Sequence, residues 1–209
     1  KKQLRMKIIC VGRNYNEHIE ELNNQRPSEP VLFLKPDTAI VKGGEPFYYP
    51  DFSEHIDYEC EIVVKISKIG KSIPVNCAKN YYDEIALGLD LTCRDIQTKE
   101  KAKSLPWTLS KAFDYSAPIS EFITLDQIGK DIQNIDFTLR KNSEIVQQAN
   151  TSQMLFTVDE IISYVSRYIS LKVGDLIFTG TPAGVGPIKI GDKLTGSIEG
   201  KEILKCEIK

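Results

Sequence analysis

Two glutamates, Glu59 and Glu61, interrupt a stretch that otherwise has the composition of a buried β-strand, residues 56–64. Because side chains alternate between the two faces of a strand, both carboxylates must point the same way, while Cys60 and Ile62 pack behind them. Two anions on one face repel each other. The pattern therefore requires a divalent cation between them, a shared proton, or exposure on a solvated face. Exposure is the commonest arrangement for an acidic pair taken alone.

A third carboxylate favours the cation. Asp90 lies in the run 86–92, which is apolar enough to be a buried strand, and a lone buried aspartate is energetically costly. Three carboxylates that converge from two buried strands would bind a hard cation, and ligation by oxygen alone favours Mg²⁺, Mn²⁺ or Ca²⁺ over Zn²⁺. The sequence therefore predicts a metal site made of Glu59, Glu61 and Asp90.

The composition limits the class of protein. The 209 residues, 41% hydrophobic and 27% charged, are typical of one folded domain spanning residues 1–209. A formal net charge of −2 and scattered Lys and Arg residues argue against nucleic acid as a partner. No run of residues is apolar enough to suggest a membrane span. Five widely spaced cysteines without a Cys-x-x-Cys pair predict reduced thiols in a cytoplasmic protein.

Hydrophobic periodicity and turn residues predict a mixed succession of strands and helices. A capping box at 157–160, followed by a buried stripe, predicts a helix there, whereas 105–114 has no clean period and is expected to be a loop. Lys35, which ends a strand before a proline, is expected to reach solvent. The other elements are strands at 7–11, 31–36, 85–92 and 175–179, hairpins at 135–148 and 193–208, and helices at 15–22, at 77–83 and from residue 94 to 99.

A histidine and a glutamate lie three residues apart in the polar helical segment 15–22. On a helix, His18 and Glu21 lie side by side, although a solvated helix face with an incidental histidine is the commoner explanation of such a pair. The next segment, 23–30, is polar and bounded by prolines, so it is expected to be a mobile connection. A catalytic pair on such an element would form a lid, here over about residues 14–30.

Three further segments hold groups that could face a ligand. Arg94 and Gln97 fall on one face of a predicted helix, where an ordinary surface position is about equally common. Lys111 lies in the irregular apolar segment 105–114. The glycine-rich run 180–187 lacks the Gly-Lys-Ser/Thr ending of a phosphate loop. It is either a plain turn or a place where backbone N–H groups approach a small anion such as a carboxylate.

With these motifs, the chain resembles the fumarylacetoacetate hydrolase family over nearly its full length, and it is most similar to the short branch of acylpyruvate hydrolases and oxaloacetate decarboxylases. Six segments in the family's order carry the resemblance, and each alone would be weak. They are Val-Gly-Arg-Asn-Tyr at 11–15, Phe-Leu-Lys-Pro at 33–36, Asp-Tyr-Glu-Cys-Glu at 57–61, Asp-Leu-Thr-Cys-Arg-Asp at 90–95, Pro-Trp-Thr-Leu-Ser-Lys at 106–111 and Thr-Gly-Thr-Pro-Ala-Gly-Val-Gly at 179–186.

The resemblance implies an α+β fold, a mixed β-roll or sandwich with flanking helices. It also implies a homodimer with one Mg²⁺ or Mn²⁺ ion per subunit. By motif position it makes Glu59, Glu61 and Asp90 the metal ligands, which agrees with the argument from the carboxylates. It makes His18 and Glu21 a dyad, carried on the lid, that activates water.

The same resemblance makes Lys111 the active-site lysine and sets Arg94, Gln97 and Thr181 against the carboxylate of a small 2-oxo acid. It implies metal-dependent cleavage of a C–C bond, by acylpyruvate hydrolysis or oxaloacetate decarboxylation, through an enolate that the metal stabilises. Two alternatives stay open. A tautomerase or isomerase, of the 2-hydroxyhepta-2,4-diene-1,7-dioate isomerase type, would use the same enolate without water attack. A non-catalytic homologue that binds a metal or ligand would have no use for the dyad.

Overall fold

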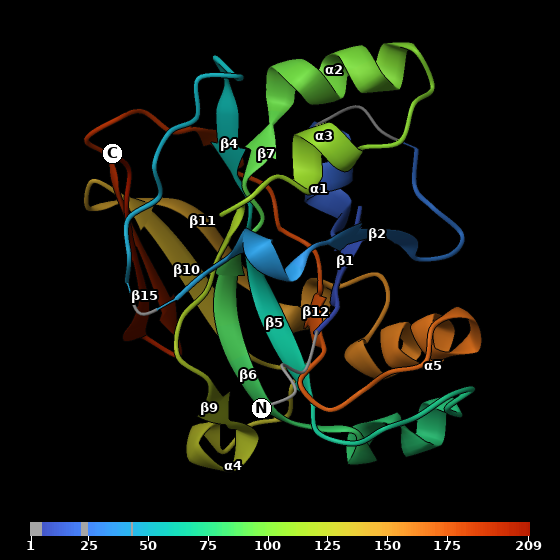
Figure 1. Cartoon of the computed structure of the whole chain (residues 1–209). Coiled ribbons are helices and arrows are strands. Elements are labelled where there is room, and N and C mark those ends of the chain that lie inside the picture. The colour runs from blue at the N-terminus through green and yellow to red at the C-terminus, as the bar shows by residue number, and fades with distance from the viewer. Residues whose placement is uncertain (1–5, 22–24, 43) are drawn as a thin grey trace, which may run out of the picture.

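The centre of the protein is a mixed six-stranded sheet with the strand order β2-β1-β12-β5-β6-β9 (Figure 1). The computed structural model describes residues 6–21, 25–42 and 44–209. In this sheet β1 runs parallel to β12, and the long strands β5 and β6 form an antiparallel pair. The strands are β1 (Ile8–Gly12), β2 (Val31–Lys35), β5 (Cys60–Ile66), β6 (Tyr82–Leu89), β9 (Ile123–Thr124) and β12 (Leu176–Phe178).

A four-stranded antiparallel sheet, with the order β11-β10-β14-β15, contacts the central sheet through β5 and β6 (Figure 1). Alternation along the central strands sends Ile62 and Leu87 into the space between the two sheets, where they join a core with Phe137, Leu139 and Leu194. The strands of this second sheet are β10 (Asp136–Lys141), β11 (Glu144–Asn150), β14 (Lys193–Ile198) and β15 (Lys201–Glu207).

Both hairpins of the second sheet turn through two residues with positive φ. These are Asn142 at 52° with Ser143 at 77°, and Glu199 at 49° with Gly200 at 75°. A two-residue turn of this kind matches the right-handed twist of the strands that it joins. The two hairpins predicted from the sequence are therefore present.

Within the described ranges, two small sheets and five helices complete the fold. Figure 1 shows α2 and α3 together at the end of the molecule where β4 and β7 lie. The longest helix, α5, has 11 residues, and no helix among the described residues is long and apolar enough to cross a membrane. The small sheets pair β4 (Ile56–Tyr58) with β7 (Thr92–Cys93) and β13 (Gly186–Pro187), and β3 (Ile40–Val41) with β8 (Ala117–Pro118). The helices are α1 (Asn16–Glu21), α2 (Arg94–Ala102), α3 (Thr108–Lys111), α4 (Leu125–Ile128) and α5 (Val158–Tyr168), with 3₁₀ turns at Asp37–Ala39, Val75–Asn80 and Thr151–Gln153.

Residues 77–83 do not form the predicted helix. A 3₁₀ turn covers Val75–Asn80, and β6 already begins at Tyr82. The strand prevails because Tyr82 pairs with Ile66 of β5, a partner that is remote in the sequence and that local propensity does not encode. The prediction of a helix at this position is therefore wrong.

The segment 105–114, expected to be a loop, contains the single helical turn α3. Its start has no side-chain cap of its own. Instead, the Glu100 carboxylate of α2 accepts hydrogen bonds from the backbone N–H of Leu109, at 3.1 Å, and from the Ser110 hydroxyl. A single turn that is held from another helix has too few residues to show a hydrophobic period.

Both predicted acidic strands break at their carboxylates. The stretch 56–64 divides at Glu59 into β4 and β5, which belong to different sheets, and the predicted strand 85–92 ends at Leu89, one residue before Asp90. The backbone N–H of Asp90 still donates to the carbonyl of Glu59 at 2.8 Å. The two acids are therefore neighbours across the end of the β5–β6 ladder, where the chain leaves the central sheet.

Thr157 offers a local test of the fold. Its hydroxyl accepts a hydrogen bond from the backbone N–H of Glu160, and the Glu160 carboxylate accepts one from the backbone N–H of Thr157, which is the predicted capping box. We expect Thr157→Ala to lower the free energy of unfolding in urea by about 1 kcal/mol, because an N–H group of α5 loses its partner. Thr157→Ser keeps the hydroxyl and is the control. An unchanged unfolding midpoint in Thr157→Ala would contradict the prediction.

Candidate active site

Three buried carboxylates gather at the end of the β5–β6 ladder. One oxygen each of Glu59, Glu61 and Asp90 lies within 4.8 Å of the others. Register explains the cluster, since Glu59 and Asp90 are cross-strand neighbours and Glu61 lies two residues along on the same face. The three residues are 5%, 2% and 1% exposed, which excludes a solvated face as the explanation of the acidic pair.

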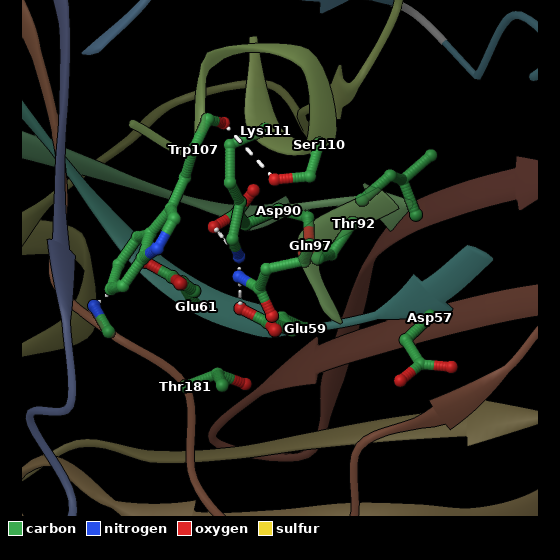
Figure 2. Close-up of polar contacts among 12 residues, drawn as sticks. Asp57, Glu59, Glu61, Asp90, Thr92, Gln97, Trp107, Ser110, Lys111 and Thr181 are labelled. Atoms are coloured by element: carbon green, nitrogen blue, oxygen red, sulfur yellow. Dashed lines mark hydrogen bonds and ion pairs between the residues drawn. The ribbon is translucent and has the colours of Figure 1, made fainter. Parts of the chain in front are cut away.

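Two lysines hold the cluster together. Lys111 Nζ, on α3, donates to Glu59 Oε2 at 2.7 Å and to Asp90 Oδ2 at 2.6 Å (Figure 2). Lys35 Nζ, at the end of β2, lies 2.8 Å from Asp90 Oδ1. The hydrogen bonds of this ammonium group are donated to the Ser116 hydroxyl, at 2.9 Å, and to the carbonyls of Ser116 and Lys111. Asp90 Oδ1 is therefore buried beside a positive charge but has no hydrogen-bond partner among the described residues.

The prediction that Lys35 reaches solvent is wrong, because the residue is only 3% exposed. A buried ammonium group needs hydrogen-bond acceptors and a counter-charge. Ser116 and Lys111 supply the acceptors and Asp90 supplies the charge. All three are remote in the sequence, so the position of Lys35 at the end of a strand gave no sign of them.

Arg94, at the start of α2, joins the cluster to a fourth carboxylate. Its guanidinium donates from Nη2 to Glu59 Oε1 at 2.7 Å, from Nε to Asp57 Oδ2 at 2.8 Å and from Nη1 to Gln97 Oε1 at 2.7 Å. The other oxygen of Asp57 lies 2.9 Å from His55 Nε2. Arg94 and Gln97 thus share one face, as predicted, and both line the cavity above the carboxylates. These contacts leave further N–H groups of the guanidinium for a ligand.

The three carboxylates differ in how well their charges are balanced. Burial raises the pKa of Glu59, but Lys111 and Arg94 outweigh it and hold that pKa well below its usual range. Burial, with the charges of Asp90 and Glu59, raises the pKa of Glu61 well above its usual range. Burial lowers the pKa of Lys111, but Asp90 and Glu59 raise it to about 12. An added positive charge would therefore stabilise the ionised form of Glu61 more than that of Glu59.

His18 faces the cluster from α1, and Glu21 lies beside it on the outer side of the cavity. His18 Nδ1 lies 3.3 Å from Glu21 Oε2, and the imidazole lines the same cavity as the carboxylates. His18 is 5% exposed, which excludes the solvated helix face considered above. Burial lowers the pKa of His18, and Glu59 and Glu21 oppose this only in part, so the imidazole is neutral at pH 7. The predicted lid, 14–30, includes residues 22–24, which lie outside the described residues.

The glycine-rich loop 180–184 ties α1 to the carboxylate cluster. The backbone N–H of Gly180 donates to Glu61 Oε2 at 2.7 Å, and that of Gly184 donates to Glu21 Oε1 at 3.0 Å. Gly184 has a φ of 95°, and a Cβ there would lie 2.1 Å from a backbone carbonyl oxygen, so only glycine fits. The loop does bring N–H groups to carboxylates, one of its two predicted uses, but these carboxylates belong to the protein itself.

Thr181 also lines the cavity. Its hydroxyl donates to the carbonyl of Cys60 at 2.9 Å and accepts from Nε2 of Gln147 at 2.8 Å. Gln147, on β11, in turn accepts a hydrogen bond from the backbone N–H of Cys60 at 2.9 Å. In this arrangement the Thr181 hydroxyl has no proton to give to a substrate carboxylate, so its predicted contact with one stays a prediction.

Six residues that the sequence analysis did not assign line the cavity or support it. Four of them lie within the motifs of the family resemblance, and that position was the only available signal. The other two reach the site from α2 and β11, and Gln147 contacts Cys60 across 87 residues of sequence, which no local pattern reveals. The six are Arg13, Lys35, Asp57, Lys101, Trp107 and Gln147.

The cluster fits a divalent cation. Its three carboxylates offer only oxygen, which is the donor atom that Mg²⁺ and Mn²⁺ prefer. Asp90 Oδ1 is buried without a hydrogen bond, and Glu61 is held beside two other anions. Lys111 already neutralises Glu59 and Asp90 in part, so a bound cation and the ammonium group would share the oxygens of these two residues.

Two relatives are named for reactions of oxaloacetate. Oxaloacetate tautomerase FAHD1, mitochondrial, of Mus musculus is 44% identical over 202 residues, which cover 97% of this chain and 91% of the relative. Oxaloacetate decarboxylase, mitochondrial, of Dictyostelium discoideum is 45% identical over 195 residues, which cover 93% of this chain and 89% of the relative. Both relatives are named as mitochondrial, whereas the cytoplasmic location expected for this chain stays a prediction, as does the homodimer.

A solved structure supports the fold, and the protein in it is named for a different reaction from that of the two relatives. Fumarylpyruvate hydrolase from Pseudomonas aeruginosa, in complex with Mn²⁺ and pyruvate, matches with a TM-score of 0.91 at 35% identity and covers 100% of this chain and 92% of that one. This match confirms the predicted α+β fold. The family model described as "Fumarylacetoacetate (FAA) hydrolase C-terminal" matches residues 7–209. Because that match and the relatives span nearly the whole chain, the protein belongs to the fumarylacetoacetate hydrolase family.

Proposed function

We propose that this protein is a divalent-metal-dependent enzyme that acts on small 2-oxo acids, with oxaloacetate as its substrate. The reactions are proton exchange at C3 between the keto and enol forms and loss of CO₂ by cleavage of the C3–C4 bond. The observation that carries the proposal is a buried imidazole, His18, in the same cavity as three clustered carboxylates. Proton transfer beside a carbonyl group needs a base next to an electrophilic site. The names of the two oxaloacetate relatives support the choice of substrate.

Glu59, Glu61 and Asp90 would hold Mg²⁺ or Mn²⁺, which when bound supplies a Lewis acid for the oxygens of a 2-oxo acid. The Mn²⁺ and pyruvate in the Pseudomonas aeruginosa structure support both parts of this assignment. The residues around the cavity then orient the substrate. Arg94 has N–H groups that its contacts within the protein leave unused, and a guanidinium suits a carboxylate because it can donate two parallel hydrogen bonds.

His18 transfers the proton. With Nδ1 turned toward Glu21, Nε2 is the atom left to take a proton from C3, and Glu21 stabilises the imidazolium that forms. Loss of CO₂ starts from the keto form, in which C3 keeps both of its protons, and the enolate left behind takes a third proton at C3, which solvent water supplies through Nε2 of His18. Lys111, with a pKa of about 12, stays protonated and provides positive charge near an oxygen that becomes negative.

The pH dependence of the reaction follows from the burial of His18. Because its pKa is lowered below 6.5, the imidazole stays neutral as the pH falls from 8 to 6.5. We expect kcat/KM for oxaloacetate to be level over this range and to fall by about tenfold per pH unit only below it. Glu59, Glu21 and Lys111 are the charged groups that face the imidazole. Glu21→Gln removes a group that raises the pKa of His18, so it should move the acid limb to lower pH.

An acid limb with its midpoint above 6.5 would contradict this assignment of the base. The matched control is Glu20→Gln, on the same helix, because Glu20 is exposed and outside the cavity. It removes the same negative charge from α1 and should leave the pH profile in place.

Hydrolysis of acylpyruvates is a second candidate. It is favoured by the likeness to a fumarylpyruvate hydrolase and by the dyad, which can take a proton from water as well as from C3. Initial rates with oxaloacetate, acetylpyruvate and fumarylpyruvate, each with Mg²⁺ and in excess EDTA, test both candidates. We expect oxaloacetate to react fastest and every rate to collapse in EDTA. Full activity in EDTA would refute the metal site, and a higher rate with fumarylpyruvate would favour hydrolysis.

A further inference from the structure

Two cationic side chains flank Trp107 in the cavity of the carboxylates. Arg13 Cζ lies 5.9 Å from the centre of the indole ring, and Lys101 Nζ lies 5.7 Å from it. The three residues come from different segments, since Arg13 follows β1, Lys101 is near the end of α2 and Trp107 directly precedes α3. All three line the same cavity as Glu61 and Asp90.

Neither cation is neutralised within the described part of the chain. The side chains of Arg13 and Lys101 make no hydrogen bond or ion pair with any residue there, apart from their contact with the ring. Arg94, by contrast, is paired with two carboxylates. Burial lowers the pKa of Lys101, and the positive charges of Arg94 and Arg13 lower it further, while the charge of Glu59 opposes this in part. This part of the cavity therefore carries unbalanced positive charge in a protein whose net charge is negative.

The backbone of Arg13 is held in an unfavourable conformation. Its φ is 61°, in the left-handed region that is unfavourable for a non-glycine residue. The next residue, Asn14, is fully buried, and its side chain bonds to the backbone of Phe156 and to the carbonyl of Thr179. The strain is therefore maintained by the fold, and it leaves Arg13 lining the cavity.

From this arrangement we propose that Arg13 and Lys101 bind the second carboxylate of a dicarboxylic 2-oxo acid. The inference rests on the proposed function, since it assumes that the 2-oxo acid end lies at the carboxylate cluster. A carboxylate beside both cations would form charge-assisted hydrogen bonds with them. The flat indole of Trp107 positions both cations and covers the apolar part of the substrate. The enzyme would accordingly prefer substrates such as oxaloacetate to monocarboxylic 2-oxo acids of the same length.

Two pairs of ligands measure what the second carboxylate contributes to the affinity, because the members of each pair have carbon chains of equal length and differ in that group. By calorimetric titration of the Mn²⁺-loaded protein, 2-oxoglutarate is compared with 2-oxopentanoate, and oxaloacetate with 2-oxobutanoate; the oxaloacetate pair is titrated in the His18→Ala background, because the active enzyme would consume oxaloacetate. In the wild type we expect the dicarboxylic member to bind about tenfold to a hundredfold more tightly in at least one pair. In the double variant Arg13→Gln/Lys101→Gln this preference should shrink to about twofold or less, while the monocarboxylic ligand binds as before.

The matched control is Lys99→Gln. Lys99 is exposed on the same helix as Lys101 and lies outside the cavity, so this variant removes one of α2's positive charges, as the Lys101→Gln change does, without touching the subsite. It should keep the full preference. Unchanged binding of the monocarboxylic ligand shows that a variant is folded, and Arg13→Lys, which keeps the charge, should retain part of the preference.

Three results would overturn the inference: no preference in the wild type, a preference that survives in the double variant, or equal loss of both ligands of a pair. Failure of the proposed function is a separate outcome. It would appear as wild-type protein that does not turn over oxaloacetate, whatever its affinity for 2-oxoglutarate, because binding of 2-oxoglutarate is measured without turnover.

Discussion

His18→Ala is expected to lower the turnover of oxaloacetate by about 10²–10⁴, the usual size of a general-base contribution. The loss follows from the position of the imidazole, which is buried in the cavity and held at Nδ1 by Glu21. The affinity for oxalate, a chelating mimic of the enol product, should change little because His18 does not contact the carboxylate cluster. Turnover measured by the loss of enol absorbance, together with calorimetric titration of oxalate, separates the two effects.

The matched variants on α1 sharpen this test. Glu21→Gln keeps the shape of the dyad but removes the charge that stabilises the imidazolium, so it should lose less activity than His18→Ala. Glu20→Gln should keep wild-type turnover. If His18→Ala cleaves oxaloacetate and exchanges its C3 proton at wild-type rates, then His18 is an ordinary buried histidine and another group carries the proton.

Glu61→Gln and Asp90→Asn are expected to have the same effect on metal binding but opposite effects on the metal-free protein. Each removes an oxygen anion from the cluster, so each should weaken Mg²⁺ binding by about tenfold or more and abolish turnover. Asp90 is the counter-charge of two buried ammonium groups, so Asp90→Asn should lower the free energy of unfolding in EDTA by about 3–5 kcal/mol. Glu61 accepts only from the neutral N–H of Gly180, so Glu61→Gln relieves repulsion and should raise the unfolding midpoint.

Urea unfolding in EDTA and calorimetric titration of Mg²⁺ measure the two effects separately. Asp83→Asn is the control, since Asp83 is exposed on the same strand as Asp90's neighbours and outside the cluster. It should change neither quantity. Destabilisation of the metal-free protein by Glu61→Gln would mean that Glu61 has a positively charged partner, contrary to the geometry described above.

The predictable parts of the fold are those whose signals are local. The capping box at Thr157 and the glycine turn at Gly200 act within a few residues, and both elements formed as predicted. The alternation that placed Glu59 and Glu61 on one face, with Ile62 behind them, also holds. The end of a strand depends on which residues of another strand pair with it. The sequence alone therefore could not show that β5 begins only after Glu59.

The unpredictable parts of the site are those built by residues that are remote in the sequence. Lys35 seemed free to reach solvent because Ser116 and Asp90 follow it by many residues. The Thr181 hydroxyl seemed available to a substrate because its acceptor, the carbonyl of Cys60, belongs to another strand. In both cases the residue type was informative, whereas the direction of its hydrogen bonds depended on tertiary contacts.

The loop 180–184 has a consequence for how metal binding and the position of α1 are related. One end of it binds Glu61 of the carboxylate cluster, and the other binds Glu21 of the dyad. A cation that binds Glu61 therefore acts on the same short loop whose other end holds α1 through Glu21. Thermodynamic linkage makes such an effect reciprocal. If the cation stabilises the observed position of α1 by some factor, then α1 in that position raises the affinity for the cation by the same factor. We therefore expect binding of the cation and the position of α1 to be coupled through this loop, so that a change in one changes the other.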